Sequence, residues 1–207
     1  GNDDNVGKYF SPYYLPSSNL LDAYDQGDLR RTTWFSSAKY PVFVTGTFYD
    51  GITVFVKYIG NPYLYSGFIE TGAHAAKPLM ISEMYLIAAE SALATGNASK
   101  AAEYLNAIRK RSPNLEPATA ETVTVEMILN EKSKEFFQEG LRYWDRLRHG
   151  EKIEFNDEIM GIDCPHRDKV IDTKSYHKIV LPISTDELNS NPTLRTQQNP
   201  GYPAYVG

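Results

Sequence analysis

The clearest pattern of apolar and polar positions lies between residues 79 and 150 and has the period of an α-helix. One apolar segment runs from Leu79 to Thr95 and meets Gly96-Asn97, a pair typical of a helix C-terminus. A second segment runs from Ala98 to about Arg111 and stops before Pro113. Small residues recur on both segments and allow close packing: Ala88, Ala89, Ala92, Ala101 and Ala102. The pattern predicts a helical hairpin.

A third helix is predicted from about Val123 to His149, with Gly150 just past its end. Stepping about 100° per residue gathers apolar side chains on one stripe. The stripe holds Leu129, Phe136, Gly140, Tyr143 and Leu147, with Phe137 and Trp144 on its flank. We expect this stripe to face the core.

A neighbouring strip of the same predicted helix carries charges. Acidic residues four positions apart repel by about 0.2–0.5 kcal/mol, so they favour a cation supplied by another element. Glu83 and Glu90 share an otherwise apolar face of the first helix and are expected to be buried against arginines. The sequence therefore predicts a structural ion network of Glu83, Glu90, Arg109, Arg111, Glu131, Glu135, Glu139, Arg142 and Arg146.

A catalytic alternative uses two of these acids. Glu135 and Glu139 on one helix could lie the ~5–9.5 Å apart that the carboxylates of a glycoside hydrolase require. Neighbouring arginines would lower the pKa of both carboxyls and impair a general acid. The neighbouring arginines therefore favour the structural network over hydrolysis.

The regions on either side of the helices are loop-rich, residues 1–78 and 151–207. A short helix from Asn19 to Gln26, capped by Ser18, is expected in the first of them. Asp50-Gly51 lies between two β-rich runs and predicts the turn of a β-hairpin. Residues 1–78, 79–150 and 151–207 are expected to form one domain of 1–207.

Composition excludes several classes of function. A net charge of −5 gives no basic footprint for nucleic acid, and no run of about 20 apolar residues could span a membrane. Asp163–Asp168 offers Cys164 and His166 between two carboxylates, but without the second pair of ligands typical of zinc sites. We expect no metal, cofactor or nucleic acid. Residues 1–10 carry no leader pattern, which suits a mature chain or a fragment.

Three blocks between residues 79 and 203 resemble the C-terminal part of the SusD/RagB family. The first is "SEMYLIAAESALATGNASKAAEYLNAIRKR", which also resembles a tetratricopeptide-type helix pair. The second includes "EFFQEGLRYWDRLRHG", and the third is "LPISTDELNSNPTLRTQQNPGY". The fold that the resemblance implies is mainly α: a SusD-like helix hairpin and long C-terminal helix, with a small β-hairpin and extensive ordered loops.

The resemblance also implies a role. Members of this family bind glycans or other nutrients at the outer-membrane surface, without cleaving them, for a SusC-like TonB-dependent transporter. They are lipid-anchored in the full-length protein and are more than twice as long as this chain. Aromatic rings in loops and hairpins suit stacking on sugars, and the candidates here are Trp34, Tyr40, Tyr49, Tyr63 and Tyr65.

Two other classes of function stay open from the sequence. One is a helical-repeat module that binds a partner protein and no glycan. The other is the glycoside hydrolase that would use Glu135 and Glu139.

Overall fold

The computed structural model describes residues 14–57, 78–154, 160–162, 170–172, 180–199 and 201–202. Contacts between Cα atoms divide the chain into two compact units. Unit 1 comprises residues 1–137 and 157–164, and unit 2 comprises residues 138–156 and 165–207. The expectation of one domain over 1–207 stays a prediction, and each unit is considered by itself.

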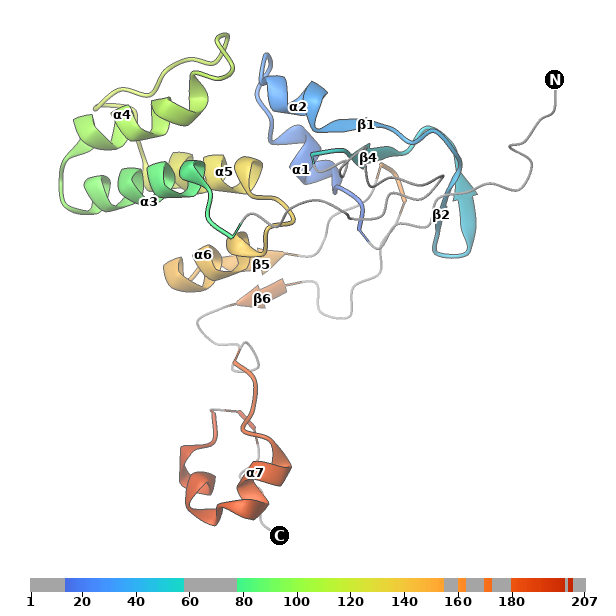
Figure 1. Ribbon diagram of the computed structural model, residues 1–207, viewed down its shortest axis with the longest axis vertical. Helices are drawn as coiled ribbons and strands as arrows, with labels where there is room; N and C mark the ends of the chain where they lie inside the picture. The colour runs from blue at the N-terminus through green and yellow to red at the C-terminus, as the bar shows by residue number, and fades with distance from the viewer. Residues whose placement is uncertain are drawn as a thin grey trace. The chain divides into compact units, whose positions relative to one another are not determined.

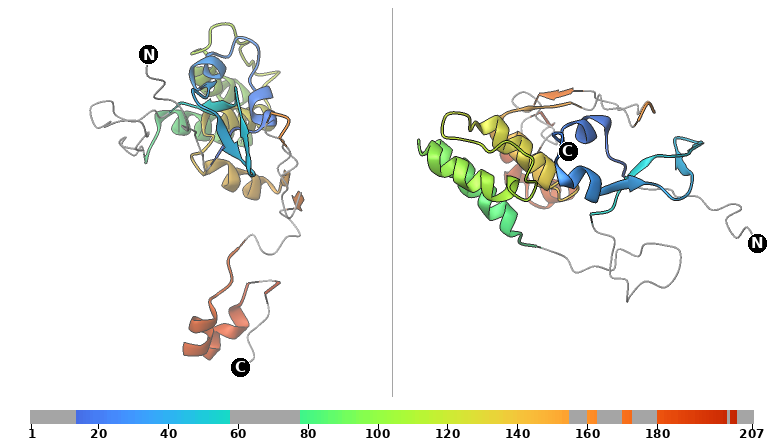
Figure 2. Two further views of the ribbon diagram at one scale, coloured as in Figure 1. Left: turned by 90° about the vertical axis from the view of Figure 1, so that its right-hand side faces the viewer. Right: turned by 90° about the horizontal axis from the view of Figure 1, so that it is seen from above.

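The helical hairpin predicted from the apolar pattern is present in unit 1. It consists of α3 (Ile81–Ala94) and α4 (Ala98–Arg109), which lie side by side with α5 (Val125–Glu135) against α3 (Figures 1 and 2). Gly96 adopts φ +82° between the first two helices, and Asn97 caps α4 by accepting a hydrogen bond from the Lys100 amide. Interior side chains from all three helices are buried: Leu86, Ala89, Ala101, Leu105, Ile128 and Leu129.

The β-hairpin region folds differently from the prediction. Strands β2 (Val42–Val44) and β3 (Thr47–Tyr49) pair around a turn at Thr45-Gly46, where both residues have positive φ as in a type I′ turn. The predicted turn at Asp50-Gly51 is wrong. With the turn at Thr45-Gly46, Val42 lies opposite Tyr49, and both pack in one apolar cluster with Ile52.

A second strand pair continues from the first. Strand β1 (Phe35–Ser37) pairs antiparallel with β4 (Thr53–Phe55), so that Asp50-Gly51 only links β3 to β4. The Phe35 ring packs in a second cluster with Leu21, Tyr24 and Phe137. These contacts hold β1 against the segment that contains Leu21 and Tyr24.

Two short helices precede the strands in unit 1. Helix α1 (Ser18–Asp22) is capped by Ser17 and is shorter than the predicted helix from Asn19 to Gln26. Helix α2 (Leu29–Thr33) was not predicted; Asp28 caps it by accepting a hydrogen bond from the Arg30 amide. Figure 1 shows α2 leading directly into β1, and the two elements are in contact.

The predicted long helix from Val123 to His149 is wrong, because the helix ends with α5 and a second one begins later. Gln138 and Gly140 adopt φ +64° and +74°, and a separate helix α6 (Leu141–His149) begins at Leu141 in unit 2. A left-handed backbone at two positions cannot continue an α-helix. The stripe predicted to face the core is therefore divided: Leu129, Phe136 and Phe137 are buried, but Tyr143 is exposed and Trp144 is 66% exposed.

Among the described residues of unit 2, four regular elements follow α6. Strands β5 (Lys152–Glu154) and β6 (Val170–Asp172) pair antiparallel, with Ile153 opposite Ile171. Helix α7 (Thr185–Ser190) contacts the 3-10 helix η2 (Pro192–Gln197), in a tail expected to be loop-rich.

Candidate functional site

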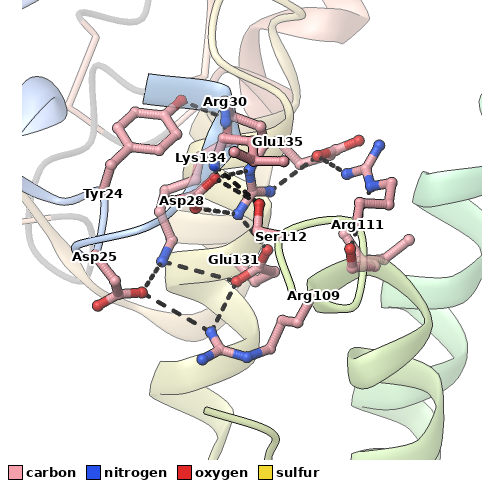
Figure 3. A network of polar contacts seen from close by, with 12 residues as sticks. Tyr24, Asp25, Asp28, Arg30, Arg109, Arg111, Ser112, Glu131, Lys134 and Glu135 are labelled. Atoms are coloured by element: carbon pink, nitrogen blue, oxygen red, sulfur yellow. Dashed lines mark hydrogen bonds and ion pairs between the residues drawn. The ribbon is translucent and has the colours of Figure 1, made fainter. Parts of the chain in front are cut away.

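Charged side chains from four segments of unit 1 meet around Arg30 on α2 (Figure 3). Its guanidinium donates to Asp28 Oδ2 at 2.7 Å, to Glu131 Oε1 at 2.6 Å and to Glu135 Oε2 at 2.9 Å. The Arg30 side chain is only 8% exposed, and that of Glu131 is fully buried. Arg30 therefore joins the α2 segment to α5 through a desolvated ion cluster.

Local structure explains why these groups can meet. Glu131 and Glu135 are one helical turn apart on α5, so both carboxylates leave the same side of the helix. Asp28 caps α2 and also receives the Nε and Nη2 protons of Arg30. The planar guanidinium with five donors suits this arrangement of three carboxylates.

Three further cations balance the acids (Figure 3). Arg109 Nη1 lies 3.2 Å from Glu131 Oε2, and Arg111 pairs with Glu135. Lys134 Nζ lies 3.0 Å from Asp25 Oδ2 and 3.7 Å from Glu131 Oε2. Buried charges are tolerated when they are paired and hydrogen-bonded in this way.

The electrostatics favour the charged forms of Asp28 and Arg30. Burial raises the pKa of Asp28, but the hydrogen bond and positive charge of Arg30 outweigh it and hold the pKa below its ordinary value. Burial lowers the pKa of Arg30, while its bonds to Asp28 and Glu131 bring the net shift upward. A buried set of paired charges is typical of a structural scaffold.

Tyr24 couples this cluster to the aromatic core and gives a pH prediction. Its hydroxyl donates to the Lys134 carbonyl at 2.7 Å, and burial raises its pKa above the ordinary 10.0. A raised pKa means that the stabilisation from neutral Tyr24 is complete below pH 10.0 and is lost as the pH rises further. We expect Tyr24→Phe to remove part of the alkaline fall in stability, measured by urea unfolding from pH 8 to 11. An unchanged alkaline profile would contradict this role, and Tyr14→Phe, at an exposed residue, is the control.

The structure brings four of the nine predicted network residues together: Arg109, Arg111, Glu131 and Glu135. Glu90 lies elsewhere in unit 1 and pairs with Lys132 at 2.7 Å, a lysine of α5 where an arginine was predicted. Glu83 is half-buried and forms no ion pair with another described residue.

The other three predicted network residues belong to unit 2. Arg142 Nη2 and Arg146 Nη1 lie 3.3 and 3.7 Å from Glu151 Oε2, a carboxylate beyond the helix. Glu139 precedes α6 in the break between the helices. The expectation of one ionic strip from Glu131 to Arg146 is wrong because the helix that would carry it is broken.

Sequence reasoning missed the central residue of the cluster. The signal was the stretch "GDLRR", in which Asp28 can cap a short helix and turn its side chain toward Arg30. Arg30 precedes Glu131 by 101 residues, so no local pattern could pair them.

The predicted stacking residues fall into different places. Trp34 packs in the cluster of Phe35 and Phe137, and the ammonium of Lys57 lies 4.5 Å from its ring centre. Tyr49 packs beside Val42 and Ile52, and Tyr40 is half-buried with Lys39 over its ring. Tyr63 and Tyr65 lie outside the described residues.

The described residues hold neither a group of metal ligands nor a membrane-spanning helix. Within these residues, no group of three or more His, Cys, Asp or Glu side chains could hold a metal ion. Asp163–Asp168 lies outside them. Nor does any helix of the described part combine the length and apolar character needed to cross a bilayer.

Comparison with known proteins identifies similar chains. The model of the SusD family matches residues 69–202. A solved SusD superfamily protein from Bacteroides thetaiotaomicron superposes with a TM-score of 0.68 and 28% identity, covering 89% of this chain and 40% of that one. A SusD superfamily protein from Bacteroides fragilis gives a TM-score of 0.55 at 28% identity, with the same coverage.

A third solved structure, from Bacteroides vulgatus, is provisionally described as a sugar binding protein. It is 36% identical, with a TM-score of 0.52, and the match covers 60% of this chain and 28% of that one. The chain thus spans between 28% and 40% of the length of these solved relatives. No curated protein matches the chain.

Proposed function

Because this chain belongs to the SusD family, we propose that it binds glycans or other nutrients and delivers them, uncleaved, to a SusC-like TonB-dependent transporter. The family match over residues 69–202 carries this proposal. It includes the helical layer of α3 to α5 and the tail with α7. The sugar-binding description of the Bacteroides vulgatus relative supports a carbohydrate as the ligand.

A binding role without catalysis agrees with the charges of unit 1. The Glu135 carboxylate accepts hydrogen bonds from both Arg30 and Arg111, and Glu139 is outside α5. Both acceptor contacts of Glu135 are thus made to guanidinium groups of the scaffold. These contacts favour a scaffold role for Glu135 over hydrolysis.

The proposed location is the outer-membrane surface, where a lipid on the full-length protein would anchor it. Family membership supports this location and the transporter partner. Sugar contacts are proposed for the aromatic candidates in the first region, Trp34, Tyr40 and Tyr49. The packing of Trp34 against Phe137 and Lys57 favours the two tyrosines over Trp34 as stacking surfaces.

Calorimetric titration tests the proposal. The full chain is titrated with maltohexaose, cellohexaose, laminarihexaose and mannohexaose, and we expect saturable heat with at least one of them. The absence of binding to every oligosaccharide would contradict glycan binding and favour the protein-interaction module. Release of reducing ends that disappears in Glu135→Gln would instead favour the hydrolase.

A further inference from the structure

A cavity of about 400 Å³ lies in unit 1 between the α1–α2 segment and the loop that follows α4. Its lining includes Asp22, Gln26, Arg31 and Asn114, with Leu21 and Leu29 as apolar contacts. The volume falls within the range of about 300–1,000 Å³ that small-molecule sites occupy. The cavity is therefore large enough for a sugar unit.

Four polar side chains of this lining have unused hydrogen-bonding capacity. Among the residues that the structure describes, the side chains of Asp22, Gln26, Arg31 and Asn114 form no hydrogen bond or ion pair with one another or with other groups. Arg31 is held instead over the Phe35 ring at 5.7 Å. Together they offer a carboxylate acceptor, a guanidinium donor and two amides that can donate and accept.

The charges in the lining nearly cancel. Asp28 is neutralised by Arg30 at 2.7 Å, and Asp25 by Lys134 at 3.0 Å. The remaining charged groups, Asp22 and Arg31, have opposite signs. A balanced set of donors and acceptors suits a neutral polyhydroxyl ligand better than a cation or an anion.

The loop that lines the cavity is held in place before any ligand arrives. Gly27 has φ +90°, and a Cβ on it would lie 2.9 Å from the Asn114 Cβ, so the close approach of the two segments requires glycine. The Leu29 amide donates to Ser112 Oγ at 3.0 Å, which fixes the two segments together. Asp25 and Asp28 of the same loop are held by ion pairs to Lys134 and Arg30, and such preorganisation reduces the entropy lost on binding.

We propose that this cavity is a subsite for one neutral sugar unit, held through its hydroxyls by Asp22, Gln26, Arg31 and Asn114. Leu21 and Leu29 would contact the C–H face of the ring. The inference rests on the proposed glycan binding and adds a contact site formed by residues other than the aromatic candidates.

Paired variants test the subsite in the full chain. The double variant Asp22→Asn with Asn114→Ala removes a charged acceptor and an amide but leaves the Arg30 cluster unchanged. We expect its affinity for the oligosaccharide that binds best in the panel of hexasaccharides to fall about tenfold or more, since hydrogen bonds to charged groups are the strong ones. The matched control is Asp50→Asn with Asn130→Ala, at exposed positions of the same unit, and should bind as the wild type does.

NMR spectroscopy provides a second measurement, on side chains that line the cavity. In ¹⁵N-correlated NMR spectra of the wild-type chain, the side-chain amide signals of Gln26 and Asn114 should shift on addition of the same oligosaccharide. This readout does not depend on the stability of any variant.

The outcomes separate the two proposals. Equal binding by the wild type and the double variant, with unmoved amide signals, overturns the subsite and leaves glycan binding standing. Failure of every hexasaccharide to bind or to shift the signals overturns both. Signals that move with calcium chloride and not with sugars overturn the subsite in favour of a cation site.

Discussion

Replacement of Arg30 by methionine is expected to lower the free energy of unfolding by about 3–5 kcal/mol. Methionine keeps much of the aliphatic stem but leaves Asp28, Glu131 and Glu135 without their shared guanidinium. The cost arises because buried carboxylates that lose their partner keep their desolvation penalty. Urea unfolding monitored by circular dichroism at pH 7 measures the change.

A control and a double-mutant cycle make this prediction specific. Lys100→Met removes a pair in which both Lys100 and Glu103 are well exposed, and should leave the unfolding midpoint in urea nearly unchanged. Adding Glu131→Gln to Arg30→Met removes one carboxylate that has lost its partner. The double variant should therefore lose less unfolding free energy than the two single variants lose together. Additive losses, or a loss for Arg30→Met as small as for Lys100→Met, would contradict the role of Arg30 as the centre of the cluster.

Truncation of Leu86 to alanine is expected to cost about 2–5 kcal/mol of unfolding free energy. Leu86 is fully buried on α3, where the helical layer of α3, α4 and α5 packs together. The truncation removes transfer energy and leaves a cavity that rigid helices can only partly close. Denaturant unfolding of the full chain gives the value, provided that the transition remains cooperative.

The matched control for this truncation is the same change at Leu79, two residues before α3. Leu79 is 80% exposed, so Leu79→Ala should change stability by no more than about 0.5 kcal/mol. Comparable losses for the two variants would mean that the α3 face assigned to the core is not the one that stabilises the fold.

Local chemistry accounts for what could be predicted. The helical hairpin of α3 and α4 was predicted correctly because its apolar spacing, small residues and Gly96-Asn97 turn all act within one or two turns of helix. The structure and its SusD superfamily neighbour confirm the mainly helical fold, and the match over residues 69–202 confirms the family. Such signals depend only on residues that are close together in the sequence.

The helix break and the hairpin turn show where local patterns fail. Periodicity continued through Gln138 and Gly140, and the left-handed backbone there appears only in the structure. Asp50-Gly51 is the stronger turn signal by composition, but the turn forms at Thr45-Gly46, which lets Val42 and Tyr49 pack in the same cluster. Packing against other elements outweighed the local signal.

By itself, the sequence determined the hairpin of α3 and α4, the acidic residues of α5 and the family. Only the tertiary structure decided that Arg30, 101 to 105 residues earlier in the chain, supplies the charge that those acids need. The physical reason is range: helix propensity and capping act between neighbours, whereas burial brings together charges that no sequence spacing relates.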